Sequence, residues 1–281
     1  MKLFKIVFNF YINASIHVAL AVYSLVRITE LYLRLPYNVN LDFFILYGTI
    51  TGYNFIKYAG IAKLHHQSLT ENLKIVQVFS LISFVLMLLY AYRLSFKTLL
   101  VFFPLAIITL LYAIPFLNGA TKNLRNVKFL KIILIAFVWA ITTVLLPVID
   151  TDFIVNISHI YQIAQRVLLV VVLTLPFDIR DLKYDAKNLQ TLPQVLGVER
   201  AKKMGFVLLG VSVFLEFFIT PNNNFKTVFI MVFFMLLTLL QRTKIKQTKY
   251  YASFWVEAVP IVWLLMLSFI NNKQKFLLMF F

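Results

Sequence analysis

The chain has 281 residues, of which 61% are hydrophobic and only 14% are charged, and its mean hydropathy is +0.85. The apolar residues come in runs near the length that crosses a bilayer, and no other stretch is long enough for a separate soluble domain. We therefore predict a polytopic α-helical membrane protein. The net charge of +16 does not indicate a nucleic-acid partner, because the basic residues lie in short loops rather than on one surface.

Apolar segments follow one another along the whole chain. They predict an all-α protein of about nine transmembrane helices surrounding a central cavity, in a single domain of residues 1–281. The segments lie near residues 8–28, 42–61, 75–92, 97–116, 129–149, 154–177, 205–221, 225–241 and 252–270. The first segment has no obvious small-residue cleavage site, so we expect a retained helix. The lack of cysteine excludes disulfides, thiol nucleophiles and cysteine-ligated metals.

Basic residues alternate between the two ends of these segments. Lys and Arg precede the first segment and gather in the second, fourth, sixth and eighth connections, whereas Asp150 and Asp152 lie in a connection without nearby Lys or Arg. Because positive residues favour the cytoplasmic side, we predict a cytoplasmic N-terminus, cytoplasmic basic loops and an outer C-terminus.

The sixth connection carries a concentration of carboxylates. Asp178, Asp181 and Asp185 fall within eight positions, although the chain has only 11 acidic residues. On a helix they would project from one face. Such oxygen ligands suit Mg²⁺, with substrate phosphates completing the shell. The alternative interpretation is a solvated interfacial helix with alternating charges.

With this pattern in view, the chain resembles the UbiA superfamily of intramembrane prenyltransferases. The run Asp178-x-x-Asp181-x-x-x-Asp185, continued by Thr191-Leu192-Pro193 and Leu196-Gly197, is similar to the second Asp-rich motif of that family. Members have nine transmembrane helices and bind an isoprenyl diphosphate through Mg²⁺ at two such motifs, on the second and sixth connections. The resemblance implies that the three aspartates are catalytic and hold Mg²⁺.

Other positions of the resemblance suggest residues that bind the diphosphate. The segment from Tyr112 to Lys131 is similar to one that supplies a tyrosine and basic residues. Where the first motif would begin, Asn54 matches, but the three carboxylate positions hold Phe55, Tyr58 and Ala62. We hypothesise that fixed cations share the diphosphate with a single Mg²⁺ on the Asp trio. The predicted substrate-binding residues are Asn54, Lys57, Tyr112, Lys131, Arg180 and Lys183.

The resulting expectation is transfer of an isoprenyl group from a prenyl diphosphate to a lipophilic, aromatic or quinone-type acceptor within the bilayer. Two other functions stay open. One is a non-catalytic relative that binds an isoprenoid or a partner enzyme, which the missing carboxylates support. The other is a transporter, although no inverted repeat is apparent.

Several polar residues fall inside predicted spans. Arg166, Glu216 and Glu257 are functional candidates by default, with a mutual structural salt bridge as the competing interpretation. Asn13 and His17 either line a polar cavity or bond across helices.

Overall fold

A computed structural model of the chain describes residues 2–64, 71–114, 124, 127, 130–151, 155–184 and 189–278. These residues form helices and turns and contain no strand, which confirms the all-α prediction. The helices are α1 (Lys2–Asn13), α2 (Ile16–Leu33), α3 (Val39–Leu64), α4 (Glu71–Ala91), α5 (Phe96–Ala113), α6 (Leu130–Ala140), α7 (Leu146–Asp150), α8 (Ile157–Asp181), α9 (Leu192–Leu196), α10 (Val198–Ile219), α11 (Asn223–Arg242) and α12 (Val259–Leu278). Two π-helical turns, Ile141–Leu145 and Tyr251–Val256, join α6 to α7 and precede α12.

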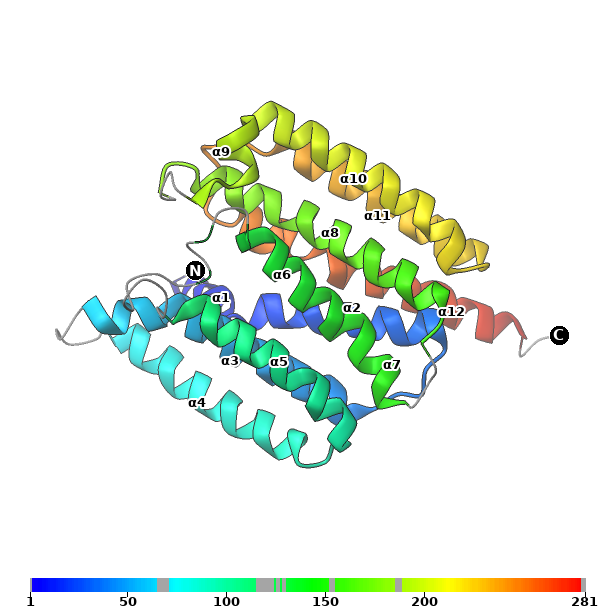
Figure 1. The fold of residues 1–281 in the computed structure, drawn as a ribbon, viewed down its shortest axis with the longest axis horizontal. Helices are drawn as coiled ribbons and strands as arrows, with labels where there is room; N and C mark the ends of the chain where they lie inside the picture. The colour runs from blue at the N-terminus through cyan, green and yellow to red at the C-terminus, as the bar shows by residue number, and fades with distance from the viewer. Residues whose placement is uncertain are drawn as a thin grey trace.

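The long helices run side by side (Figure 1). Within the described residues, seven helical stretches are long and apolar enough to cross a membrane, and α3 and α10 are not among them. A multi-pass membrane protein is therefore confirmed, whereas the number of nine spans remains a prediction.

The first predicted segment is not one helix. Helix α1 ends at Asn13, and α2 begins at Ile16 after Ser15 adopts a left-handed conformation with φ of 60°. The expectation of a continuous helix over 8–28 is thus wrong. Since no glycine or proline marks the break, side chains from elsewhere must stabilise a conformation that costs a non-glycine residue about 1–2 kcal/mol.

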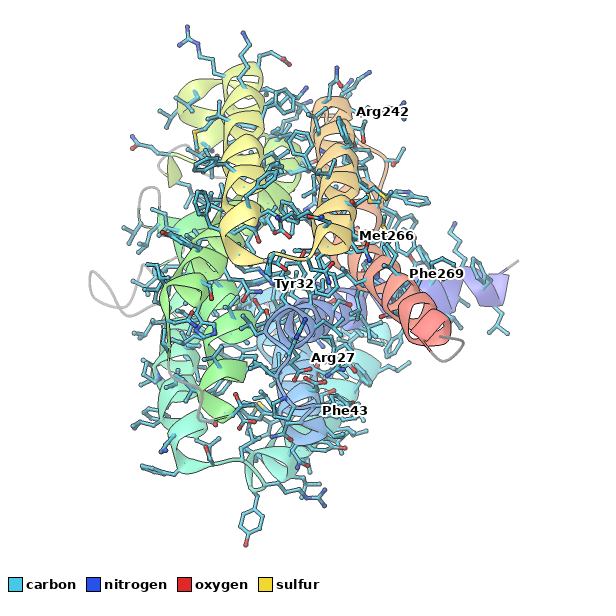
Figure 2. All side chains as sticks on the ribbon, turned by 90° about the vertical axis from the view of Figure 1, so that its right-hand side faces the viewer. Arg27, Tyr32, Phe43, Arg242, Met266 and Phe269 are labelled. Atoms are coloured by element: carbon cyan, nitrogen blue, oxygen red, sulfur yellow. The ribbon has the colours of Figure 1, made fainter. Side chains whose placement is uncertain are left out.

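Helix α2 lies at the centre of the bundle at one end of the molecule. Leu25 and Ile28 belong to one buried apolar cluster, and Val22 and Val26 belong to another. Helix α2 therefore packs against other helices on two of its sides. Figure 2 shows Arg27 and Tyr32 of α2 among the surrounding helices. The helices thus surround α2 at this end, and α8 finishes toward the other end of the bundle.

Two charged residues inside the bundle serve the packing of α2. Arg166 and Glu216, for which a salt bridge was one of two interpretations, form no ion pair with each other. Arg166 donates instead to the carbonyl of Leu25 at 3.1 Å, and Glu216 accepts from Tyr32 at 2.8 Å and from Gln165 at 2.8 Å. Both side chains are about 1% exposed. Because neutral donors and acceptors hold each charge within the bundle, we assign Arg166 and Glu216 a structural role.

The helix ends that flank the predicted Asp-rich connection lie on one side of the molecule. The carboxyl end of α8, helix α9, the start of α6 and the N-terminal helix α1 all lie toward the left of Figure 1. Helices α3 and α8 both finish there, which brings the second and sixth connections of the chain to the same end of the bundle.

Candidate functional site

The last turn of α8 brings Asp178 and Asp181 to this end of the bundle. Asp178 is 3% exposed, and its Oδ1 atom lies 2.9 Å from the Nζ atom of Lys131 in the first turn of α6. Asp178 and Lys131 are 47 positions apart in the chain, and the fold joins them in an ion pair. A buried carboxylate needs such a partner, because an unpaired charge would be strongly destabilising there.

A small recess adjoins this ion pair. Lys131 and Asp178 line it together with Leu189, Gln190 and Thr191, and it encloses about 210 Å³ of space outside the atoms, part of it open to solvent. The hydroxyl oxygen of Thr191 is buried without a hydrogen-bond partner. A hard oxygen donor is therefore available beside the aspartate for a ligand that enters the recess.

The second aspartate is held by its neighbour in the sequence. Arg180 donates from Nε and from a terminal nitrogen to the two carboxylate oxygens of Asp181, at 2.7 and 3.0 Å. The guanidinium also lies 5.1 Å from the ring centroid of Phe177. Because both charged side chains are about one third exposed, this forked pair lies at the mouth of the site rather than inside it.

Polar residues of α3 close the break between α1 and α2. Asn54 donates to the carbonyl of Ala14 at 3.1 Å and to the hydroxyl of Ser80 at 2.8 Å. Lys57 donates to the hydroxyl of Ser15 at 2.9 Å, and Tyr58 donates to the carbonyl of Asn13 at 3.0 Å. These bonds satisfy groups that the interrupted helix leaves free. The segment that would carry the first Asp-rich motif thus stabilises the backbone.

Lys57 also faces the space beside α8. Its side chain is exposed, and it interacts electrostatically with Arg180 of α8 and with Glu257 near the start of α12. Asn54, by contrast, is 3% exposed and bonds toward α1 and α4. Of the two predicted residues on α3, only Lys57 therefore reaches the mouth where the Asp motif lies.

Aromatic residues lie deeper than the cations. Tyr53 is one helical turn inward from Lys57 on the same face of α3, and its hydroxyl accepts a bond of 2.9 Å from the indole of Trp139. Tyr112 is 7% exposed and interacts electrostatically with Tyr53. Tyr112, in the last turn of α5, is therefore close to Tyr53, and its contact with a diphosphate stays a prediction.

Lys183 is at the outer edge of the site. Lys183 is exposed in the turn that follows α8. Asp185 lies outside the described residues, so the geometry of the Asp trio stays a prediction. Within the described part of the chain, no group of three His, Asp or Glu side chains has the arrangement of a metal site.

Two polar features of the site were not assigned a role from the sequence. Glu257 lies between the π-helical turn 251–256 and α12 and interacts with Lys57 and Arg180. Tyr11 bonds to Nδ1 of His17 at 2.6 Å, and Nε2 of His17 bonds to the carbonyl of Phe254 at 2.9 Å. Ionisable groups within apolar segments were the available signal, but the sequence did not indicate which helices face one another.

Comparison with solved structures identifies the arrangement of the helices. A UbiA homologue from Archaeoglobus fulgidus bound to GPP and Mg²⁺ superposes with a TM-score of 0.61 at 14% sequence identity, covering 92% of this chain and 97% of the other. The chain has the UbiA fold. Another A. fulgidus UbiA homologue structure gives 0.57 at 12% identity over 95% and 98% of the two chains. A digeranylgeranylglyceryl phosphate synthase structure gives 0.56 at 14% identity over 96% and 99%. No sequence-family model and no curated protein sequence matches the chain.

Within this UbiA fold, the second and sixth connections start from the same end of the bundle, on α3 and α8. Lys57 and Arg180 interact across that end, and the ion pair of Lys131 and Asp178 lies beside it. This chain therefore combines one pair of aspartates with cations from three helices at a single mouth.

Proposed function

We propose that the chain is a UbiA-type prenyltransferase, which transfers an isoprenyl group from a prenyl diphosphate to a lipophilic, aromatic or quinone-type acceptor within the membrane. The observation that carries this proposal is the ion pair of Lys131 and Asp178, which lines a recess at the end of the UbiA fold where Arg180, Asp181 and Lys57 also lie. This arrangement can hold an anionic headgroup at the membrane surface while the hydrocarbon enters the bundle.

The residues of this end fit the demands of allylic ionisation. When the bond between carbon and diphosphate breaks, negative charge accumulates on the leaving group, and fixed cations lower the barrier by stabilising it. Lys57, Lys131, Arg180 and Lys183 supply those cations. The ring faces of Tyr53 and Trp139, further inward, suit an allylic cation because aromatic faces attract positive charge and exclude water.

We further propose that Asp178, Asp181 and Asp185 hold Mg²⁺. The two described aspartates are one helical turn apart, and the free hydroxyl oxygen of Thr191 lines the recess beside Asp178, so the available donors are those that Mg²⁺ prefers. When bound, the ion would neutralise part of the diphosphate charge. Lys131 and Arg180 hold the aspartates in position through their ion pairs.

The test uses the full-length protein in detergent or nanodiscs. Binding of a labelled prenyl diphosphate is measured with Mg²⁺ and with EDTA, and product formation is followed with aromatic and quinone-type acceptors. We expect binding and turnover to need Mg²⁺ and to be lost in Asp178→Asn. Glu199→Gln, on an exposed surface of α10, is the matched control and should behave as wild type. The proposal is contradicted if donor binding is unchanged both in the Asp178→Asn variant and in the presence of EDTA.

A second candidate is an isoprenoid diphosphate-binding protein without turnover. The specific observation in its favour is that Tyr58 stands at a first-motif carboxylate position and bonds to the carbonyl of Asn13, so this segment stabilises a helix break. The same experiment separates the two candidates, because a binder retains the donor with Mg²⁺ but forms no product with any acceptor.

We also propose that the mouth of the site faces the cytoplasm, with the N-terminus on that side and the C-terminus outside. The distribution of Lys and Arg supports this orientation. Because the chain has no cysteine, single Thr248→Cys and Asn223→Cys variants report on the two ends of the bundle. A membrane-impermeant maleimide should label position 223 from outside intact cells and position 248 only after permeabilisation. The reverse labelling would invert the proposed topology.

A further inference from the structure

Glu257 is an ionisable side chain within the bundle, at the start of the last apolar segment. It follows the π-helical turn 251–256, and its backbone N–H bonds to the carbonyl of Ala252, five residues earlier, at 3.3 Å. Its side chain is partly exposed, and within the described part of the chain it forms no hydrogen bond or ion pair. Turns of this kind occur often at functional sites, where they redirect a side chain.

Side chains from several helices act on this carboxylate. Lys57 of α3 and Arg180 of α8 interact with it electrostatically, as do Tyr11 of α1 and Tyr53 of α3. Each of these four already has a hydrogen-bond partner, respectively Ser15, Asp181, His17 and Trp139. Glu257 thus keeps its oxygens available although polar groups surround it.

The position of Glu257 along the bundle follows from the same interactions. Lys57 and Arg180 lie near the mouth, whereas Tyr53 is one turn further inward on α3. Hydrogen bonds agree with this position, because Phe254, three residues before Glu257, bonds through its carbonyl to His17 at 2.9 Å, and Lys57 donates to Ser15, two residues before His17. Glu257 therefore lies beside Lys57 where α1 meets α2, between the cations that would hold a diphosphate and Tyr53 of the aromatic wall. This is the level at which the first carbon of a bound prenyl donor and the acceptor must meet.

We propose that Glu257 is the catalytic base that takes the proton released by the acceptor, an inference that rests on the proposed prenyl transfer. The allylic C–O bond breaks, and its electron pair leaves with the diphosphate. A carbon or oxygen of the acceptor forms the new bond to the first prenyl carbon. The proton bound to that acceptor atom passes to the carboxylate of Glu257 and then to water. The products are the prenylated acceptor, diphosphate and one proton.

The test separates ionisation of the donor from transfer. Glu257→Gln keeps the size of the side chain and removes the base, so donor binding and exchange of a bridging ¹⁸O label within the bound donor should stay within about threefold of wild type. Transfer to the acceptor should fall by about 10²- to 10⁴-fold, the usual contribution of a general base. The wild-type rate should decline at low pH, and this decline should be absent from the residual activity of the variant.

Other results overturn the assignment. Transfer within about threefold of wild type would show that Glu257 is dispensable. Parallel loss of donor binding, isotope exchange and transfer would show that it only balances the charge of Lys57 and Arg180. Should Glu257→Gln not fold, Glu257→Asp must transfer slowly and keep the decline at low pH; a pH-independent rate would refute the base. Wild-type protein that neither binds nor exchanges the donor would instead refute the proposed function itself.

Discussion

The buried ion pair of Lys131 and Asp178 gives the sharpest prediction for stability. Its two atoms are 2.9 Å apart, and the side chains are 13% and 4% exposed. At an effective dielectric constant of about 20, the attraction is about 6 kcal/mol, from which the desolvation of two ions subtracts several kcal/mol. Removal of one partner leaves the other charge buried and unpaired, so we expect Lys131→Met to lower the free energy of unfolding by about 3 kcal/mol.

A double-mutant cycle checks this value. Wild type, Lys131→Met, Asp178→Asn and the double variant are unfolded with denaturing detergent in mixed micelles. Since the double variant buries no unpaired charge, it should be about 2–3 kcal/mol more stable than the sum of the single effects predicts. The pair of Lys202 and Glu199, at 3.3 Å and with the Glu199 side chain 80% exposed, is the control and should couple by less than about 1 kcal/mol. A coupling below about 0.5 kcal/mol for the buried pair would refute the reasoning.

Four further substitutions test the break in the first helix and the packing of α10. Lys57→Met removes both the bond to Ser15 and a cation of the mouth. It should therefore weaken binding of a prenyl diphosphate about tenfold and lower the melting temperature by a few degrees. Unchanged binding would exclude Lys57 from the site. Asn54→Leu should lower the melting temperature but leave the donor Kd unchanged. A Cβ at Gly205 would meet buried leucine side chains at 2.5 and 2.8 Å, so Gly205→Ala should lower the free energy of unfolding by about 1–3 kcal/mol. At Gly210 a Cβ meets only open space, so Gly210→Ala should raise the free energy of unfolding by about 0.5–1 kcal/mol.

The sequence contained enough information for the helical architecture but not for its irregularities. Runs of apolar residues mark membrane-length helices because the bilayer fixes their length. The break at Ser15 escaped prediction because the segment lacks glycine and proline, and its hydrogen bonds come from residues about 40 positions away on α3. The π-helical turns were equally unpredictable, since they depend on packing between helices and not on a local motif.

The prediction of the candidate site relied on its charged residues, which are informative because charged residues are scarce in this chain. Asp178 and Lys131 were selected separately and lie 2.9 Å apart. Asn54 was selected by its match to a motif, yet it is buried toward α1 and α4, because a motif position does not reveal which neighbour a side chain meets. Glu257 drew attention as an ionisable residue within an apolar segment. Its place between Lys57 and Arg180 required the three-dimensional arrangement.

The attachment of the N-terminal helix has a consequence for biogenesis. His17 bonds to the carbonyl of Phe254, 237 residues later, and Asn9 accepts bonds from Lys249 and Tyr250, 240 and 241 residues later. During synthesis, α1 and the start of α2 are made long before the residues that bond to Asn9 and His17. Asn9 and His17 must therefore wait in the membrane without these partners until the segment 249–254 has been made, and translation arrested before residue 249 would leave both side chains without these bonds.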